Sequence, residues 1–178
     1  MKLILAMVIG ILCAVTLQAW GAEIPATSLV SADSLSNIHS GNWNVGGSID
    51  FAKNSGRRND SSEFNTVFTA KYFLVDRFAL GLAGGVDVET GEDTVATVGP
   101  AVSYVFWTNE KLAASIGSSI RVGLTDATVS SVVGFDLGFN YFITPSVALG
   151  PSLFYNHYNS RSRDYSRYGM SMGLGIYL

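Results

Sequence analysis

Strict two-residue alternation is the feature that most restricts how this sequence can fold. In two arms, 63–72 and 78–87, large apolar side chains alternate with small or polar ones. Such alternation predicts β-strands with one apolar face, and about ten residues is the length of one tilted bilayer crossing. The connecting residues 73–77 carry aromatic neighbours on both sides of the polar pair Asp76-Arg77. The stretch therefore predicts a hairpin whose apolar face ends in an aromatic belt.

The same unit occurs twice more. Residues 104–112 and 141–149 repeat the aromatic pair, the polar turn and the start of a return strand. Recurrence of one supersecondary unit predicts a chain built from two-strand modules. We therefore expect three short turns on one side of a barrel.

Eight segments show the alternation, which predicts an all-β fold, an eight-stranded antiparallel up-and-down transmembrane β-barrel. The expected strands are 42–53, 63–72, 78–87, 94–106, 112–122, 133–141, 147–156 and 167–178. An even number of strands places both ends of the barrel chain on one side. Pro100 lies in the fourth segment and would normally mark an edge strand or a bulge, but the place of that segment in the repeat favours a strand.

Composition agrees with a β fold. The chain has 178 residues, 48% of them hydrophobic and 14% charged, which suits one domain, and its 19 glycines disfavour a mainly helical one. No apolar run after the N-terminal segment has the length of a membrane helix. The sequence has no paired His/Cys spacing and no phosphate loop, so we expect no metal, no cofactor and no nucleic-acid partner.

The N-terminal segment predicts export. Residues 1–21 combine Lys2, an apolar core and a small-x-small site, as in a signal peptide. The only cysteine, Cys13, lies within this segment after Leu12, where a lipoprotein would need a small residue. We expect residues 22–41 to form a periplasmic lead-in and residues 42–178 to form the barrel.

The chemistry of the two strand faces favours a membrane barrel. One face is Phe, Leu, Ile, Val and Tyr, whereas the other is Gly, Ala, Ser and Asn with a few charges. Eight strands enclose room only for close-packed side chains, so the small and polar face must point inward. The apolar face then needs lipid, and a closed barrel satisfies its backbone there. A soluble secreted sandwich or lipocalin-like barrel remains the alternative.

The chain resembles the small outer-membrane protein β-barrel domain family, of the OmpA/OmpX type. The resemblance rests on the turns 72–81 and 141–150, on the pairs Gly99-Pro100 and Gly150-Pro151, and on the alternating C-terminal strand. It implies the bacterial outer membrane as location, with outer-membrane lipids, lipopolysaccharide and the barrel-assembly machinery as partners, and a monomer. The family usually ends in an aromatic residue, whereas this chain ends Ile176-Tyr177-Leu178.

Charged residues on the inward face are expected to pair with one another and fill the lumen, because isolated buried charges are costly. These lumen charges are Asp50, Glu63, Lys71, Asp87, Arg121, Asp136 and Arg167. The expected function is that of a non-enzymatic outer-membrane barrel with a structural or surface-interaction role. A small gated channel, opened by breaking a pair between Arg121 and a carboxylate, is the alternative.

Two expected loops carry arginines whose forked guanidinium groups suit lipopolysaccharide phosphates. These loop arginines are Arg57, Arg58, Arg161 and Arg163, and a solvated loop pair is the other interpretation. Four tyrosines near that end are expected to form an interface belt: Tyr155, Tyr158, Tyr165 and Tyr168.

An enzyme that modifies lipid A would need a histidine beside a serine and a carboxylate. His157 is the only histidine in the expected barrel, with Ser152, Ser160 and Asp164 near it in sequence. No strand places a His and a Ser two residues apart on one face, so we expect no catalytic residues.

Overall fold

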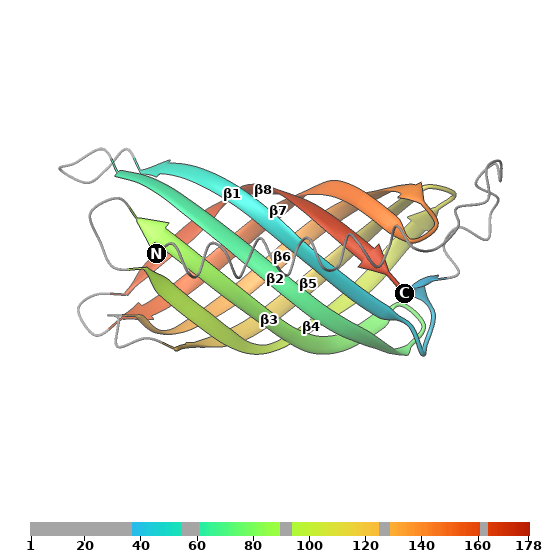
Figure 1. Ribbon diagram of the computed structural model, residues 1–178, viewed down its shortest axis with the longest axis horizontal. Coiled ribbons are helices and arrows are strands. Elements are labelled where there is room, and N and C mark those ends of the chain that lie inside the picture. The colour runs from blue at the N-terminus through green and yellow to red at the C-terminus, as the bar shows by residue number, and fades with distance from the viewer. Residues whose placement is uncertain (1–36, 55–60, 90–93, 125–128, 161–163) are drawn as a thin grey trace, which may run out of the picture.

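The computed structural model describes residues 37–54, 61–89, 94–124, 129–160 and 164–178, without the side chains of 51–54, 61–63, 89, 129–130 and 160. These residues form eight β-strands (Figure 1). Their bounds are β1 Trp43–Asn54, β2 Ser61–Val75, β3 Phe78–Glu89, β4 Val95–Asn109, β5 Leu112–Gly123, β6 Val129–Thr144, β7 Val147–Ser160 and β8 Tyr165–Tyr177.

Every strand pairs antiparallel with the next one along the chain, and β1 pairs with β8, so the sheet is a closed barrel. Reciprocal backbone hydrogen bonds between Trp43 and Leu178, of 2.9 and 2.8 Å, lie at the seam. The predicted fold class and the three short turns are confirmed: pairs 76–77, 110–111 and 145–146 connect strands at one end of the barrel. We call this the short-turn end and the opposite one the loop end (Figure 1).

Several strands are longer than the alternation predicted. The largest difference is at the loop end, where residues 157–165 were expected to be a loop but β7 continues to Ser160 and β8 begins at Tyr165. Residues 156–160 are polar or aromatic on both faces, so the contrast between faces ends before the ladder does. The ladder itself continues through the pair Tyr158 and Tyr165.

Each of the two Gly-Pro pairs lies at a gap in one ladder, Gly99-Pro100 in that of β4 with β5 and Gly150-Pro151 beside that of β6 with β7. Pairing between β6 and β7 passes from Gly138 with Ser152 to Tyr141 with Leu149 without a change of register. A Cβ atom at Gly150 would overlap the main-chain oxygen of Phe139, so the two strands approach more closely than another residue allows. Pro100 lies within β4, so the prediction of a strand there is confirmed. The strand tolerates a residue without an N–H because Pro100 lies in the gap, where no pairing with β5 needs that donor.

The barrel is inverted relative to a soluble protein. Large apolar side chains are exposed on its outer face, among them Trp43 at 48%, Leu82 at 58% and Met170 at 66%. Polar and charged side chains are buried inside, among them Asn65 and Arg121 at 1% each. Such a surface is stable in lipid rather than in water, which excludes the soluble alternative. Within the described residues, no helix has the length and hydropathy needed to cross a membrane.

Candidate functional site: the barrel lumen

Three of the lumen charges form one ionic cluster toward the loop end. Arg167 of β8 lies between two carboxylates, with Nη2 at 2.9 Å from Asp50 Oδ2 of β1 and Nη1 at 3.6 Å from Asp87 Oδ1 of β3. Tyr158 of β7 donates a hydrogen bond of 3.2 Å to the same Asp87 oxygen. The Arg167 guanidinium also lies 5.9 Å from the centre of the Phe154 ring. One arginine thus connects strands on both sides of the seam.

Arg121 is the most deeply buried of the six described lumen charges, with 1% of its surface exposed. Its Nη2 donates to Asn156 Oδ1 at 3.3 Å, and its charge interacts with that of Asp87. Its Nε and Nη1 groups have no hydrogen-bond partner among the described residues. Glycine provides the room for this side chain, because a Cβ atom at Gly85 would overlap Arg121 Nη1.

Lys71 of β2 and Asp136 of β6 form a second charge pair, which interacts electrostatically across the lumen. Space for the Asp136 carboxylate comes from Gly117 of β5, where a Cβ atom would overlap its Oδ1. The described lumen charges are thus three cations and three anions, so their formal charges cancel. Opposite charges compensate one another in this way when water is largely excluded.

The lumen contains a polar cavity of about 170 Å³. Lys71, Asp136 and Arg121 line it, together with serines and asparagines from most strands. A buried water needs roughly 10–15 Å³ of such volume and two to four polar partners, so the cavity has room for several waters. The interior is therefore closed by discrete groups of side chains and is not packed along its whole length.

The sequence predicted most of this site. Six of the seven lumen charges face the interior, and the structure places three of them in direct contact. The seventh, Glu63, lies in β2 with its side chain outside the described part of the chain. All four loop arginines, Arg57, Arg58, Arg161 and Arg163, also lie outside the described residues.

Tyr158 and Asn156 were not identified from the sequence as members of the site. The expectation that Tyr158 belongs to an interface belt is wrong, because it is 1% exposed and points inward. Its ring stacks on that of Tyr165, with ring centres 4.6 Å apart. The other three tyrosines, Tyr155, Tyr165 and Tyr168, are exposed as expected. The expected strand 147–156 already had Asn156 on its inward face, and extending its alternation by two residues would have placed Tyr158 there too.

The histidine considered for catalysis lies on the lipid-facing side of the barrel. His157 pairs with Ser166 across β7 and β8, and its Nδ1 is 3.0 Å from Ser166 Oγ, which also contacts the Tyr155 hydroxyl at 2.9 Å. The hydroxyl of Ser152 instead forms a hydrogen bond of 2.6 Å with the hydroxyl of Ser171 inside the barrel. Within the described residues, His157 contacts no carboxylate, and no group of three His, Cys, Asp or Glu side chains suits a metal ion.

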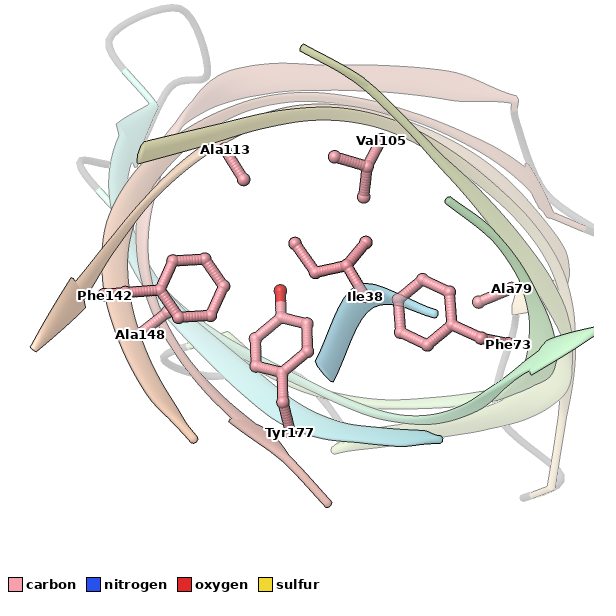
Figure 2. Packing of buried hydrophobic residues seen from close by; sticks show 8 residues of the cluster. All are labelled: Ile38, Phe73, Ala79, Val105, Ala113, Phe142, Ala148 and Tyr177. Atoms are coloured by element: carbon pink, nitrogen blue, oxygen red, sulfur yellow. The ribbon is translucent and has the colours of Figure 1, made fainter. Parts of the chain in front are cut away.

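The short-turn end is closed by apolar side chains, which we call the mouth cluster. It consists of Ile38, Phe73, Ala79, Val105, Ala113, Phe142, Ala148 and Tyr177 (Figure 2). Beside it, the carboxylate of Asp76 accepts a hydrogen bond from the Ser40 amide at 3.1 Å and lies 3.2 Å from His39 Nδ1. These two hydrogen bonds, the amide's first, lower the pKa of Asp76 below its usual value. Ile38 had no periodic signal in the sequence, so its place here was not predicted.

No family model and no curated protein matches the sequence. Solved structures do: Neisserial surface protein A is 18% identical, with a TM-score of 0.59 over 77% of this chain and 97% of that one. A chain from the de novo design of transmembrane β-barrels is 14% identical, with a TM-score of 0.50 over 78% and 97%. The outer membrane protein OprG from Pseudomonas aeruginosa is 13% identical, with a TM-score of 0.48 over 80% and 98%. The chain has the fold of the small eight-stranded β-barrels of the bacterial outer membrane.

Proposed function

We propose that the protein is a non-enzymatic outer-membrane barrel with a closed lumen, whose role is structural or is carried out at the cell surface. The observation that supports this most is the position of Arg167, whose guanidinium connects Asp50 and Asp87 across the interior. Moving it aside would take a cation away from two carboxylates inside the barrel, which is unfavourable. By the usual orientation of such barrels, the short-turn end faces the periplasm and the loop end faces outward.

Solute flux through proteoliposomes tests the closed lumen. We expect vesicles containing the wild-type protein to swell in an osmotic sugar gradient no faster than protein-free vesicles, with a general porin as positive control. The shift in gel mobility on heating shows that the wild-type protein is folded. Faster swelling of vesicles that contain this folded protein would contradict the proposal.

A gated channel is the second candidate function. The cavity of about 170 Å³ favours a channel, because it already forms part of a polar path through the lumen behind the ionic cluster. Arg121 favours it too, since two of its donor groups are free among the described residues to take a different partner. This candidate predicts brief openings that become frequent when Arg121 is replaced by Met, whereas a permanently closed barrel predicts none in either protein.

Lipopolysaccharide is the partner we propose for the loops. The support is chemical: the four loop arginines lie in the connections after β1 and before β8, two strands that pair with each other. Replacing all four with Ser should lower the lipopolysaccharide that co-purifies, and replacing all four with Lys should retain part of it, because charge remains but the fork is lost. Lys111→Ser, in a turn at the opposite end, is the matched control. Equal lipid content in all variants would reject this partner.

Absence of catalysis is also part of the proposal. The Ser166–His157 contact lacks a carboxylate among the described residues, so nothing there orients the imidazole as a base. We expect lipid A from cells expressing His157→Ala to be identical by mass to lipid A from cells expressing the wild type. A mass difference would show that the contact is catalytic.

A further inference from the structure

Residues 37–41 form a tight turn that enters the barrel at the short-turn end instead of leading away from it. Ile38 is 3% exposed and belongs to the mouth cluster, whose other seven members come one each from β2 to β8 (Figure 2). Tyr177 and Phe142 approach with ring centres 5.1 Å apart. A side chain surrounded by seven of the eight strands lies across the opening of the lumen.

Hydrogen bonds attach this turn to two hairpins on opposite sides of the opening. Toward the β2–β3 hairpin, the Arg77 amide donates to the Ile38 oxygen at 3.1 Å and the Ser40 amide donates to Asp76 at 3.1 Å. Toward the β6–β7 hairpin, Asn37 Nδ2 donates to the Pro145 oxygen at 3.2 Å. These hairpins are four strands apart in a barrel of eight, so the turn spans the opening.

The receiving hairpin contributes backbone groups of its turn to this contact. Arg77 has a φ of 70°, the only positive φ among the described residues other than glycine. Tight hairpin turns commonly place a residue in this left-handed conformation, and the β2–β3 hairpin has a register shift beside its turn. Its amide contacts Ile38, and its oxygen accepts a hydrogen bond of 2.8 Å from Val105, a member of the mouth cluster. The turn and the mouth are therefore built as one unit.

We propose that the periplasmic mouth of the barrel is a binding site for the chain's own residues 37–41, which act as a plug that closes the lumen from the periplasmic side. This closure is separate from the ionic cluster: it is apolar, it lies at the opposite end, and the polar cavity lies between the two. The proposal goes beyond a closed lumen because it assigns one of the two barriers to a segment outside the strands.

Cysteine accessibility tests the plug directly. Ser103 lines the cavity two residues from Val105, so Ser103→Cys reports entry from the mouth. Cys13 is the only cysteine in the sequence, so Cys13→Ser provides a background without other thiols. The protein is placed in lipid nanodiscs, and the rate of reaction with a charged, membrane-impermeant methanethiosulfonate is measured. Shifted gel mobility on heating confirms that each variant is folded.

We expect Ile38→Ser to raise the labelling rate at position 103 at least about tenfold, since roughly every 1.4 kcal/mol lost from the closed state is a factor of ten in its population. Combining Ile38→Ser with Asn37→Ala and Asp76→Ala should raise it further. Ile38→Val should keep the slow rate. Leu74→Ser is the matched control, because it makes a similar change at the same end but on the exposed outer face.

Equal labelling rates in the wild type and the triple variant would overturn the plug, whether both are slow or both are fast. This failure differs from failure of the closed-lumen proposal, because the closed lumen fails only if solute passes through the wild-type protein. A plug confined to the mouth predicts faster labelling of the cavity in Ile38→Ser without sugar flux, because the ionic cluster still closes the other end.

Discussion

Replacing Arg167 with Met tests whether the ionic cluster holds the loop end together. Methionine keeps much of the length and apolar stem of arginine, so the change removes mainly the charge and its donors. Asp50, which is 5% exposed and only 2.9 Å from the guanidinium, then loses the cation that compensates it. Asp87 loses a more distant contact at 3.6 Å and keeps its hydrogen bond from Tyr158.

The expected cost follows from these environments. Breaking a buried ion pair by removing one partner costs about 3–5 kcal/mol. Asp50 also lines the polar cavity, where water can enter, and Asp87 keeps part of its compensation. We therefore expect the low end, about 3 kcal/mol, which is roughly a hundredfold change in the unfolding equilibrium.

Reversible urea unfolding in lipid vesicles, followed by tryptophan fluorescence, measures this cost. A double-mutant cycle with Asp50→Asn isolates the pair, and we expect a coupling of about 1–3 kcal/mol, because Arg167→Met should cost much less once the carboxylate is gone. Arg167→Lys should lie between, since one ammonium replaces a fork with several donors. A cost below about 1 kcal/mol, the same with and without Asp50→Asn, would refute the assignment of this cluster as the closure.

Three further predictions concern other parts of the barrel. Gly150→Ala should lower the free energy of unfolding by about 1–3 kcal/mol, because its Cβ overlaps a neighbouring strand. In the control Gly84→Ala, the Cβ would meet only an oxygen at 3.6 Å, so the free energy of unfolding should change by less than about 1 kcal/mol. Equal effects of the two substitutions would contradict the close approach of the strands at Gly150. Tyr158→Phe should cost about 1.5–3 kcal/mol, since it removes a hydrogen bond to a charged group, and no change in urea unfolding would show that this bond is unimportant. The contacts of Asp76 lower its pKa, so this carboxyl should stay ionised at neutral pH. Its contribution to stability is fully present above its unfolded pKa and is lost as the pH falls through the lowered, folded pKa. A ¹³C titration that gives an ordinary or raised pKa would contradict this.

The fold was predictable because the side-chain period of a strand is two, and this chain keeps that period over eight segments. From Phe78 to Val86, for example, every second residue is large except Gly84, and the residues between them are Ala or Gly. One shift of register would exchange the faces, so the same pattern also predicted which charges point inward. Asp50, Arg121 and Arg167 were placed correctly for this reason.

Other parts of the site carried no periodic signal. Tyr158 follows His157 in a stretch where both faces are polar or aromatic, so alternation no longer separates inside from outside. Ile38 is placed by tertiary contacts with seven strands that are far from it in sequence. Pairs such as Arg167 with Asp50 depend on the closure of β8 on β1, which gives proximity between the two ends of the barrel chain. Partner choice among inward charges therefore required the register.

Single-channel current recording on the wild-type protein in a planar lipid bilayer tests the central claim most directly. A lumen closed by the ionic cluster at the outer end and by the mouth cluster at the periplasmic end predicts a flat current at both polarities after insertion is verified. Discrete, reproducible current steps from folded wild-type protein would contradict a closed lumen and would favour the gated channel.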